Sequence, residues 1–170
     1  MELFEAIKQR YSCRAYLPRP VEREKLDRVL EAARLAPSAR NLQDWRFVVV
    51  QDAETRRELG VAANKQMFIA TAPAIIVGCS VTDQTMRCGQ PIAAIDVAIA
   101  LEHVALAAAA EGLATCWIGS FYPDQVRAVL DIPLQAAVVE LMPIGYPADT
   151  HTRKPREPLK AIRCFERWEW

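Results

Sequence analysis

The chain has 170 residues, of which 52% are hydrophobic, and its 21 basic and 21 acidic side chains give a formal net charge of zero. A chain of this length ordinarily forms one domain, so we expect residues 1–170 to be a single folding unit. A chain without net charge has no overall basic field, which argues against nucleic acid or an acidic membrane as its partner.

Cysteine and histidine usage argues against a metal protein. The five cysteines include no C-x-x-C pair, and there are only two histidines, so no metal-ligand spacing is present. The sequence begins Met1-Glu2-Leu3-Phe4-Glu5, without the charged and apolar regions of a signal peptide. Scattered cysteines without an export signal favour reduced thiols and a cytoplasmic location.

Hydrophobic periodicity predicts that helices and strands alternate along the chain. In order, the expected elements are helices at 2–10 and 22–36, a strand at 46–51, a helix capped by Asp52, a short helical segment at 65–71, a strand at 74–79, a helix at 91–111, a strand at 114–118, a helix at 123–130 and a strand at 135–144. This mixture indicates an α/β or α+β class with a layered sheet. The apolar run Ala74-Ile75-Ile76-Val77 indicates a sheet that is covered on both faces.

The segment from Pro91 to Glu111 is the longest expected helix, and it is apolar nearly all round. It is long enough to span a bilayer, but Asp96, Glu102 and His103 within it argue against a lipid environment. A helix that is apolar on all sides is buried on several of them. In a domain of this size we expect one of those sides to be a subunit interface.

Two separated motifs are suited to one ligand. Arg10-Tyr11-Ser12-Cys13-Arg14 places two arginines and a serine on alternate residues, which share one side of an extended chain. Arginine forks match phosphate oxygens in pairs, and a serine hydroxyl adds a neutral donor. The turn at Pro37 and Ser38, followed by Asn41 and Gln43, offers amide groups suited to the edge of a heteroaromatic ring. Together the motifs predict a phosphate-bearing planar cofactor. Taken alone, the arginines could equally be solvated surface charges, and Ser38 a turn residue.

These motifs and four others give the chain its resemblance to a known family. The shared segments, in order along the chain, are Arg10-x-Ser12-x-Arg14, Ala36-Pro37-Ser38-Ala39-x-Asn41-x-Gln43-x-Trp45-Arg46-Phe47, Gly112-Leu113-x-Thr115-Cys116-Trp117-Ile118-Gly119, Ile132-Pro133, Ile144-Gly145-Tyr146-Pro147-Ala148 and Lys154-x-Arg156-x-Pro158-Leu159. Over nearly its whole length the chain resembles the nitroreductase family of flavin enzymes.

The resemblance implies an α+β fold, in which helices cover a mixed β-sheet, and an intertwined homodimer with two FMN molecules at the subunit interface. It also implies an FMN-dependent oxidoreductase that passes electrons from NADH or NADPH to a small aromatic acceptor: a nitroaromatic, a quinone or a flavin. The C-terminal tail, about residues 148–170, is expected to pack on the partner subunit. It ends in Trp168 and Trp170, and large aromatic side chains are ordinarily buried.

The resemblance also assigns residues to the cofactor. The group that would hold the FMN phosphate and ribityl chain comprises Arg10, Ser12, Arg14, Lys154 and Arg156. The turn that would approach the flavin from the other subunit contains Pro37, Ser38, Ala39 and Asn41. The residues expected around the ring are Asn64 and Gln66 at its pyrimidine edge, and Trp117, Ile118 and Gly119 along one face. Backbone N–H groups of Gly119 or Ser120 would lie near the ring nitrogen that accepts hydride.

Some features depart from the family pattern or leave two interpretations open. Asp44 stands where the family usually has proline, so the turn is expected to be less rigid. The stretch between Cys79 and Pro91 is short, which implies an open active site or one that the partner covers. Trp117 fits either a core position or a pocket wall. Cys116 has no nearby cysteine in the sequence that could resolve an oxidised sulfur.

The mechanism expected from these assignments is ping-pong. The flavin would accept hydride from the nicotinamide and then reduce a second substrate in the same pocket. Such a site needs no dedicated acid or base, so we expect no catalytic side chain, and Lys65 is a candidate for stabilising charge at the pyrimidine edge. The alternatives are a flavin-binding protein without reductase turnover, for storage or specialised flavin chemistry, and a structural dimer without cofactor. Bound yellow colour with steady NAD(P)H consumption would separate the first hypothesis from both others.

Overall fold

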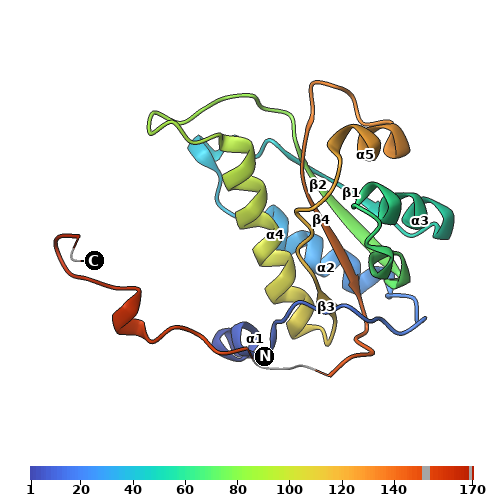
Figure 1. Cartoon of the computed structure of the whole chain (residues 1–170), viewed down its shortest axis with the longest axis horizontal. Helices are drawn as coiled ribbons and strands as arrows, with labels where there is room; N and C mark the ends of the chain where they lie inside the picture. The colour runs from blue at the N-terminus through green and yellow to red at the C-terminus, as the bar shows by residue number, and fades with distance from the viewer. Residues whose placement is uncertain (151–153, 169) are drawn as a thin grey trace.

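A four-stranded sheet lies between two layers of helices (Figure 1), in the α+β arrangement that the sequence predicts. The computed structural model describes residues 1–150, 154–168 and 170. The elements in chain order are α1 (Leu3–Gln9), α2 (Arg23–Arg34), the 3-10 helix η1 (Ala39–Asn41), β1 (Trp45–Val50), α3 (Ala53–Ala62), the 3-10 helix η2 (Met67–Thr71), β2 (Ala74–Ser80), α4 (Ile92–Ala110), β3 (Ala114–Thr115), α5 (Pro123–Leu130), β4 (Ala137–Gly145) and the 3-10 helix η3 (Leu159–Ala161).

The strand order in the sheet is β1-β2-β4-β3, and each of these neighbouring pairs is antiparallel. Parallel pairing enters at an isolated bridge, where Ser12 of the N-terminal segment lies beside Thr115 of β3. The register of β4 against β2 shifts between Gly78 and Cys79, because Gly78 lies opposite Glu140 while Cys79 lies opposite Val138. Such a bulge bends the strand and re-aims the side chains beside it.

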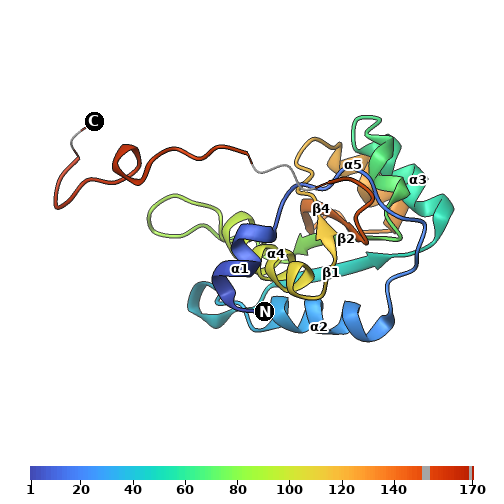
Figure 2. The same cartoon turned by 90° about the horizontal axis from the view of Figure 1, so that it is seen from below.

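Helices α2 and α4 cover one face of the sheet (Figure 2). By length and composition α4 could cross a membrane, but half of its most apolar stretch is buried inside the protein. Val97, Leu101 and Val104 on this helix are completely buried against the sheet and α2. The helix expected at 91–111 is therefore confirmed as a core helix.

Helices α3 and α5, together with η2, cover the other face of the sheet. Their core side chains Leu59, Ile69 and Val126 are completely buried. The Asp52 side chain accepts a hydrogen bond from the Thr55 N–H at 2.9 Å, which confirms the predicted cap at the start of α3. The apolar strands predicted a sheet that is covered on both sides, and this expectation is also confirmed.

Gly145 ends β4 at a point where the chain passes very close to Pro73. A Cβ atom at position 145 would lie 2.3 Å from Cδ and 2.7 Å from Cγ of the proline ring. A proline ring is rigid, so it cannot move aside as a flexible side chain would. Only glycine fits at this position, which gives a structural reason for the glycine of the Gly145-Tyr146-Pro147 segment.

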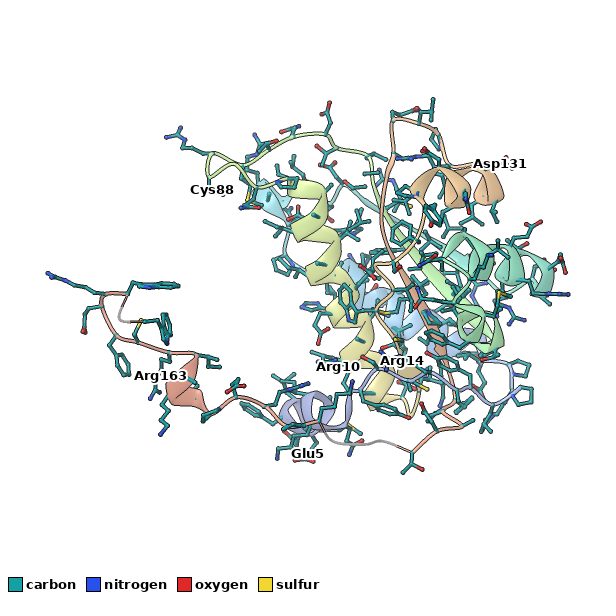
Figure 3. The ribbon with its side chains drawn as sticks, in the orientation of Figure 1. Glu5, Arg10, Arg14, Cys88, Asp131 and Arg163 are labelled. Carbon is teal, nitrogen blue, oxygen red and sulfur yellow. The ribbon has the colours of Figure 1, made fainter. Side chains whose placement is uncertain are left out.

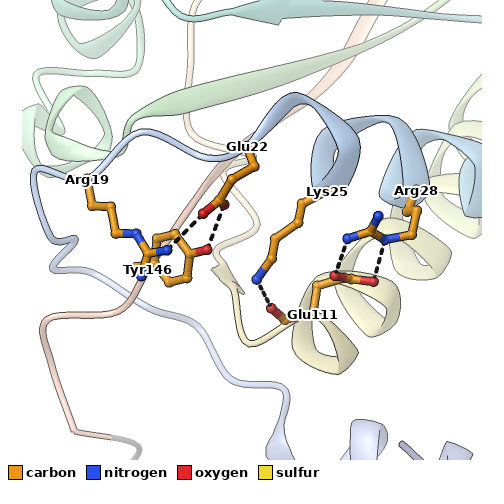
Figure 4. Close-up of polar contacts among 6 residues, drawn as sticks. All are labelled: Arg19, Glu22, Lys25, Arg28, Glu111 and Tyr146. Atoms are coloured by element: carbon orange, nitrogen blue, oxygen red, sulfur yellow. Dashed lines mark hydrogen bonds and ion pairs between the residues drawn. The ribbon is translucent and has the colours of Figure 1, made fainter.

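A polar network joins α2 to the C-terminal ends of α4 and β4 (Figure 4). The Arg28 guanidinium donates two hydrogen bonds to the Glu111 carboxylate, at 2.7 and 2.8 Å, and Lys25 Nζ donates to the carbonyl of Glu111 at 2.7 Å. The Tyr146 hydroxyl donates to the Glu22 carboxylate at 2.7 Å. Cations at the end of α4 also oppose the negative end of its dipole. The network therefore holds α2 against the end of the long helix.

Two expected elements differ from the sequence pattern. The strand predicted at 114–118 pairs as a strand only over β3, and beyond it an isolated bridge joins Ile118 to Leu141. The chain leaves regular pairing there beside the bulge in β4. The helical segment predicted at 65–71 is the 3-10 helix η2, preceded by Asn64 and Lys65 in left-handed conformations with φ of 55° and 59°. Two left-handed residues in succession end the helical path of α3 and force a new start.

The C-terminal segment, residues 154–168 and 170, extends away from the body of the protein in both views (Figures 1 and 2). Its large apolar side chains are all exposed in the single chain: Leu159, Ile162, Phe165, Trp168 and Trp170. The expected packing of these side chains on a partner subunit stays a prediction.

Candidate functional site

The basic residues that the sequence singled out lie around one cavity. The cavity has a volume of about 620 Å³, and its lining includes Arg10, Ser12, Arg14, Lys154 and Arg156. Arg10 and Arg14 lie close together in the segment after α1 (Figure 3), whereas the other two cations belong to the C-terminal segment. Segments from opposite ends of the sequence thus supply positive charge to one space.

Arg10 is the most enclosed cation of this group, with 26% of its side chain exposed. Its Nε atom is buried and has no hydrogen-bond partner among the residues that the structure describes. The Glu102 carboxylate on α4 lies 3.5 Å from this nitrogen and balances its charge. A buried donor without an acceptor costs about 1–3 kcal/mol, so the cavity suits an anion that brings acceptor oxygens.

Asp149 ties the start of the C-terminal segment to the basic motif. Its carboxylate accepts hydrogen bonds from the Tyr11 hydroxyl at 2.7 Å, the Arg14 backbone N–H at 3.0 Å and the Cys13 thiol at 3.1 Å. Burial acts to raise the pKa of Asp149, but these three hydrogen bonds outweigh burial and lower the pKa below its ordinary value. The carboxylate is therefore ionised at neutral pH, and it holds two walls of the cavity together.

The turn that contains Pro37, Ser38, Ala39 and Asn41 lies elsewhere in the single chain. Ala39 lines a second cavity, of about 580 Å³, with the loop before α4. The backbone N–H of Ala39 donates to the buried carboxylate of Asp96 on α4 at 2.9 Å. The structure therefore anchors this turn to α4, and it does not bring the turn to the basic cavity within one chain.

The same turn has a strained backbone. Arg40, Asn41 and Gln43 have φ values of 52°, 57° and 53°, a region that residues other than glycine and asparagine rarely adopt. The Ser38 hydroxyl accepts a hydrogen bond from the Gln43 N–H at 3.0 Å, and this bond closes the turn on itself. Backbone strain of this kind persists only where surrounding contacts enforce it, and it concentrates at functional sites.

The turn after α3 lies against the segment that follows β3. Gln66 donates through Nε2 to the carbonyls of Ala63 and Ser120, each at 3.0 Å. Asn64, in the same turn, is exposed and left-handed. The structure thus brings together the two groups expected around the ring, although the Gln66 amide nitrogen already binds protein carbonyls.

The three residues expected along the ring face have different environments. Ile118 is 3% exposed in the core beneath α3 and α5, and both of its backbone groups pair with Leu141, at 3.0 and 3.4 Å. Trp117 is half-buried against the cluster of α2 and α4, while Gly119 is exposed. Trp117 and Gly119 are therefore accessible to a ligand, whereas the Ile118 side chain points into the core.

Glu140 lies directly behind this segment. A Cβ atom at Gly119 would lie 3.8 Å from Oε2 of the Glu140 carboxyl group. Burial raises the pKa of Glu140 to about 7, against a smaller opposing effect of the Ile118 backbone. The carboxyl group is therefore close to half protonated at neutral pH, a condition that often marks functional sites.

The buried cysteines are poor nucleophiles. Burial raises the pKa of Cys79 to about 11, and burial together with the hydrogen bond to Asp149 raises the pKa of Cys13 to about 11. Burial also raises the pKa of Cys116. Since the thiolate is the reactive form, Cys79 and Cys116 serve as small apolar core residues, and Cys13 serves as a hydrogen-bond donor to Asp149.

Sequence reasoning missed three acids in these sites: Asp96, Glu140 and Asp149. Asp96 and Glu140 had a visible signal, because Glu140 is the one charged residue of β4 and Asp96 is one of only two acids in the apolar helix α4. Asp149 had none, since its three partners lie more than a hundred residues away along the chain.

The chain is similar to known flavin enzymes in sequence and in structure. The family model described as the nitroreductase family matches residues 7–74 and 62–146. The FMN reductase [NAD(P)H] of Bacillus subtilis is 30% identical over 183 residues, which cover 97% of this chain and 74% of the relative. A nitroreductase family protein from Clostridium difficile has a TM-score of 0.89 at 35% identity, over 99% of this chain and 100% of that one. The NADPH:FMN oxidoreductase from Vibrio harveyi, complexed with NAD+, has a TM-score of 0.90 at 26% identity, over 98% and 78% of the two chains. The chain therefore belongs to the nitroreductase family.

Proposed function

We propose that this protein is an FMN-dependent oxidoreductase that passes electrons from NADH or NADPH to a small aromatic acceptor. The observation that carries the proposal is the cavity lined by Arg10, Ser12, Arg14, Lys154 and Arg156. Membership of the nitroreductase family and the names of two relatives, an FMN reductase and an NADPH:FMN oxidoreductase, support the choice of FMN.

The charges around the cavity suit a phosphate dianion. Five cations line it, Lys8 among them, and the three carboxylates nearby leave a local excess of two positive charges: Glu5 beside Lys8, Glu102 beside Arg10, and Asp149. A phosphate monoester carries about −1.5 to −2 charges at neutral pH. Arg10 would donate its Nε–H, which has no hydrogen-bond acceptor among the described residues, and the Ser12 hydroxyl would add a neutral donor. Arginine forks and a hydroxyl bind such an anion through short, charge-assisted hydrogen bonds.

At the other end of the site, the protein positions a ring and leaves one side open. FMN, when bound, supplies the two-electron chemistry that no side chain of this protein provides. Gly119 presents backbone without a side chain, and half-buried Trp117 offers an aromatic wall. The hydrogen bonds of Gln66 hold the turn that carries Lys65 against this segment. Exposed Lys65 is the cation that we assign to negative charge at the pyrimidine edge.

A second copy of the chain would complete the site. The turn at 37–41 lines a separate cavity, and the C-terminal segment exposes Phe165 and Trp168, with 65% and 80% of each residue exposed. On α1, Leu3 and Phe4 are 62% and 72% exposed. Apolar surface of this kind marks an interaction site. An intertwined homodimer would bury both surfaces and carry the turn to the flavin of the partner, with the tail packed on the partner.

The acceptor and the location follow from simple chemical arguments. A flat slot above a flavin accepts planar molecules, so we propose a nitroaromatic, a quinone or a free flavin as the acceptor. All five cysteines are free thiols, which supports a reducing, cytoplasmic compartment.

The first experiment is a flavin-binding titration with two ligands that share the ring and differ in the phosphate. Apoprotein is titrated with FMN and with riboflavin while flavin fluorescence is recorded, in wild type and in Arg14→Ala and Arg156→Ala variants. Each variant should bind FMN about 10- to 100-fold more weakly, since a hydrogen bond to a charged group contributes about 1.5–3 kcal/mol, and should leave riboflavin binding unchanged. Arg34→Ala, which removes an exposed arginine on α2, is the matched control.

Anaerobic titration of the FMN complex with NADH and NADPH then tests the reaction. Bleaching of the flavin bands, followed by recovery on addition of menadione, is the expected result. Failure of the wild type to bind FMN would refute the proposal, and bound flavin that neither nicotinamide reduces would instead identify a flavin-binding protein without turnover.

A further inference from the structure

Glu140 occupies the middle of β4 on the sheet face that α4 covers. It lies opposite Gly78 of β2, and directly opposed residues of antiparallel strands point to the same face. A Cβ atom at Gly78 would meet Val97 and Leu101 of α4 at 2.8 and 2.9 Å, which identifies that face. On its other side, the carboxyl group reaches Gly119, the exposed residue of the proposed ring site.

The carboxyl group of Glu140 is not explained by the architecture of the fold. Its Oε1 atom is buried and has no hydrogen-bond partner among the described residues, and no ion pair of Glu140 is found in that part of the chain. A buried carboxyl oxygen without a partner is costly, so a purely structural role would favour an apolar residue here. The carboxyl group lies behind a glycine, so no side chain of residue 119 stands between it and the proposed ring site.

The groups around Glu140 are mostly not titratable. Gly78 faces it from β2 and Gly119 from the segment after β3, and the α4 side chains that pack over Gly78 are the apolar Val97 and Leu101. Cys116 is the titratable neighbour that responds to the charge of Glu140, and the charge of Arg14 acts on that same thiol. The pKa of Glu140 is raised to about 7 by burial, with a smaller opposite contribution from the Ile118 backbone.

We propose that Glu140 stores the proton that the overall reaction takes from solvent. This inference rests on the proposed function. Hydride transfer from NAD(P)H releases NAD(P)+ and delivers two electrons and one proton to the ring site, and therefore one net negative charge. The Glu140 carboxylate takes up one proton from solvent and becomes the neutral acid. When a quinone leaves as the hydroquinone, it carries away two electrons and two protons, the second of them from Glu140.

The sign of the coupling follows from electrostatics. A negative charge beside a carboxylate favours its protonated form, so Glu140 binds a proton more tightly in the reduced complex than in the oxidised one. Linkage then requires the two-electron midpoint potential to depend on pH more steeply while Glu140 changes its protonation. One additional proton taken up on reduction changes the equilibrium constant between the oxidised and reduced complexes tenfold per pH unit. For a two-electron couple this corresponds to about 30 mV per pH unit.

The test is the midpoint potential of the bound FMN, measured by spectroelectrochemistry between about pH 7 and pH 8.5. Wild type should show a slope that is steeper than that of Glu140→Gln by about 30 mV per pH unit. Glu58→Gln removes an exposed carboxylate from α3 and should behave as wild type. Equal slopes for wild type and Glu140→Gln would overturn the inference.

A second measurement needs neither FMN nor turnover. Infrared difference spectra of the apoprotein should contain a protonated carboxyl band that titrates near pH 7 in wild type and in Glu58→Gln, and that is missing in Glu140→Gln. Absence of this band in wild type would overturn the inference even if the glutamine variant fails to fold. A protein that binds no FMN would overturn the proposed function and this inference with it. A protein that binds and reduces FMN with unchanged slopes would overturn this inference alone.

Discussion

Replacement of Asp149 should loosen the basic cavity while the chain remains folded. The carboxylate accepts hydrogen bonds from Tyr11, Cys13 and Arg14, at 2.7, 3.1 and 3.0 Å. Asp149→Ala removes all three acceptor contacts. Asp149→Asn keeps the size of the side chain and one acceptor oxygen, but it places an amide donor where the carboxylate had its second oxygen.

The expected magnitude follows from these contacts. A hydrogen bond to a charged group contributes about 1.5–3 kcal/mol, and partial exposure of Asp149 reduces each contribution to about 1 kcal/mol. We therefore expect Asp149→Ala to lower the free energy of unfolding by about 2–3 kcal/mol and Asp149→Asn by about 1 kcal/mol. For a chain of this length, the alanine variant should melt about 4–12 °C below wild type.

Calorimetry and FMN fluorescence titration measure the two consequences. Asp149→Ala should weaken FMN binding about 10-fold, by analogy with the loss of one positioning hydrogen bond, and Asp149→Asn should weaken it less. Both variants remove the same negative charge, so a difference in FMN affinity between them reports on how the cavity walls are positioned. Asp27→Ala, an exposed change on α2, is the control.

Two outcomes would refute this reasoning. FMN binding that tightens equally in both variants would mean that repulsion between Asp149 and phosphate outweighs its structural role.

The second outcome concerns the pH dependence of stability. The pKa of Asp149 is lowered in the folded protein, so its contribution is present above the unfolded pKa of about 3.9 and is lost as pH falls through the folded value. The difference in free energy of unfolding between wild type and Asp149→Asn should therefore become smaller below about pH 4. A difference that grows there would contradict the stabilising role given to the Asp149 carboxylate.

Three further predictions concern other parts of the fold. Gly145→Ala should lower the free energy of unfolding by about 3 kcal/mol or more, because its methyl group would overlap a rigid proline ring. Gly119→Ala should lower it by less than about 1 kcal/mol, because its methyl group would meet a carboxylate only at 3.8 Å. Urea denaturation measures both changes. The pKa of Glu140 is about 7 in the folded protein, above its unfolded value, so the folded state binds more protons. The free energy of unfolding of wild type should therefore fall by about 2 kcal/mol between about pH 5 and pH 8. Glu140→Gln should remove most of this pH dependence in denaturation curves measured across the same range. Trp168→Ser should weaken the proposed dimer about 10-fold or more in sedimentation equilibrium, while Lys160→Ser, also exposed in the same segment, should leave the assembly unchanged.

The local elements could be predicted because their causes lie within a few residues of each other. Asp52 caps a helix through the N–H of Thr55, and Pro123 begins the helix that ends at Leu130. The strand over 74–80, which is apolar as far as Ser80, is buried throughout, as a sheet covered on both faces requires. The order of the family motifs along the chain was sufficient to indicate the fold, the family and the residues of the basic cavity.

The tertiary structure alone decided how distant side chains meet. Asp149 became the centre of the basic cavity because the chain after β4 passes beside the segment that follows α1, and no local pattern encodes that approach. The bulge in β4 re-aims the strand near Glu140, and the close pass over Pro73 demands glycine at position 145. Hydrophobic period and capping report on neighbours within about one turn or one strand, whereas these contacts depend on the order in which strands pair. The sequence alone therefore determined which elements form and which ligand chemistry they suit, and the packing of the sheet decided which acids hold the site together.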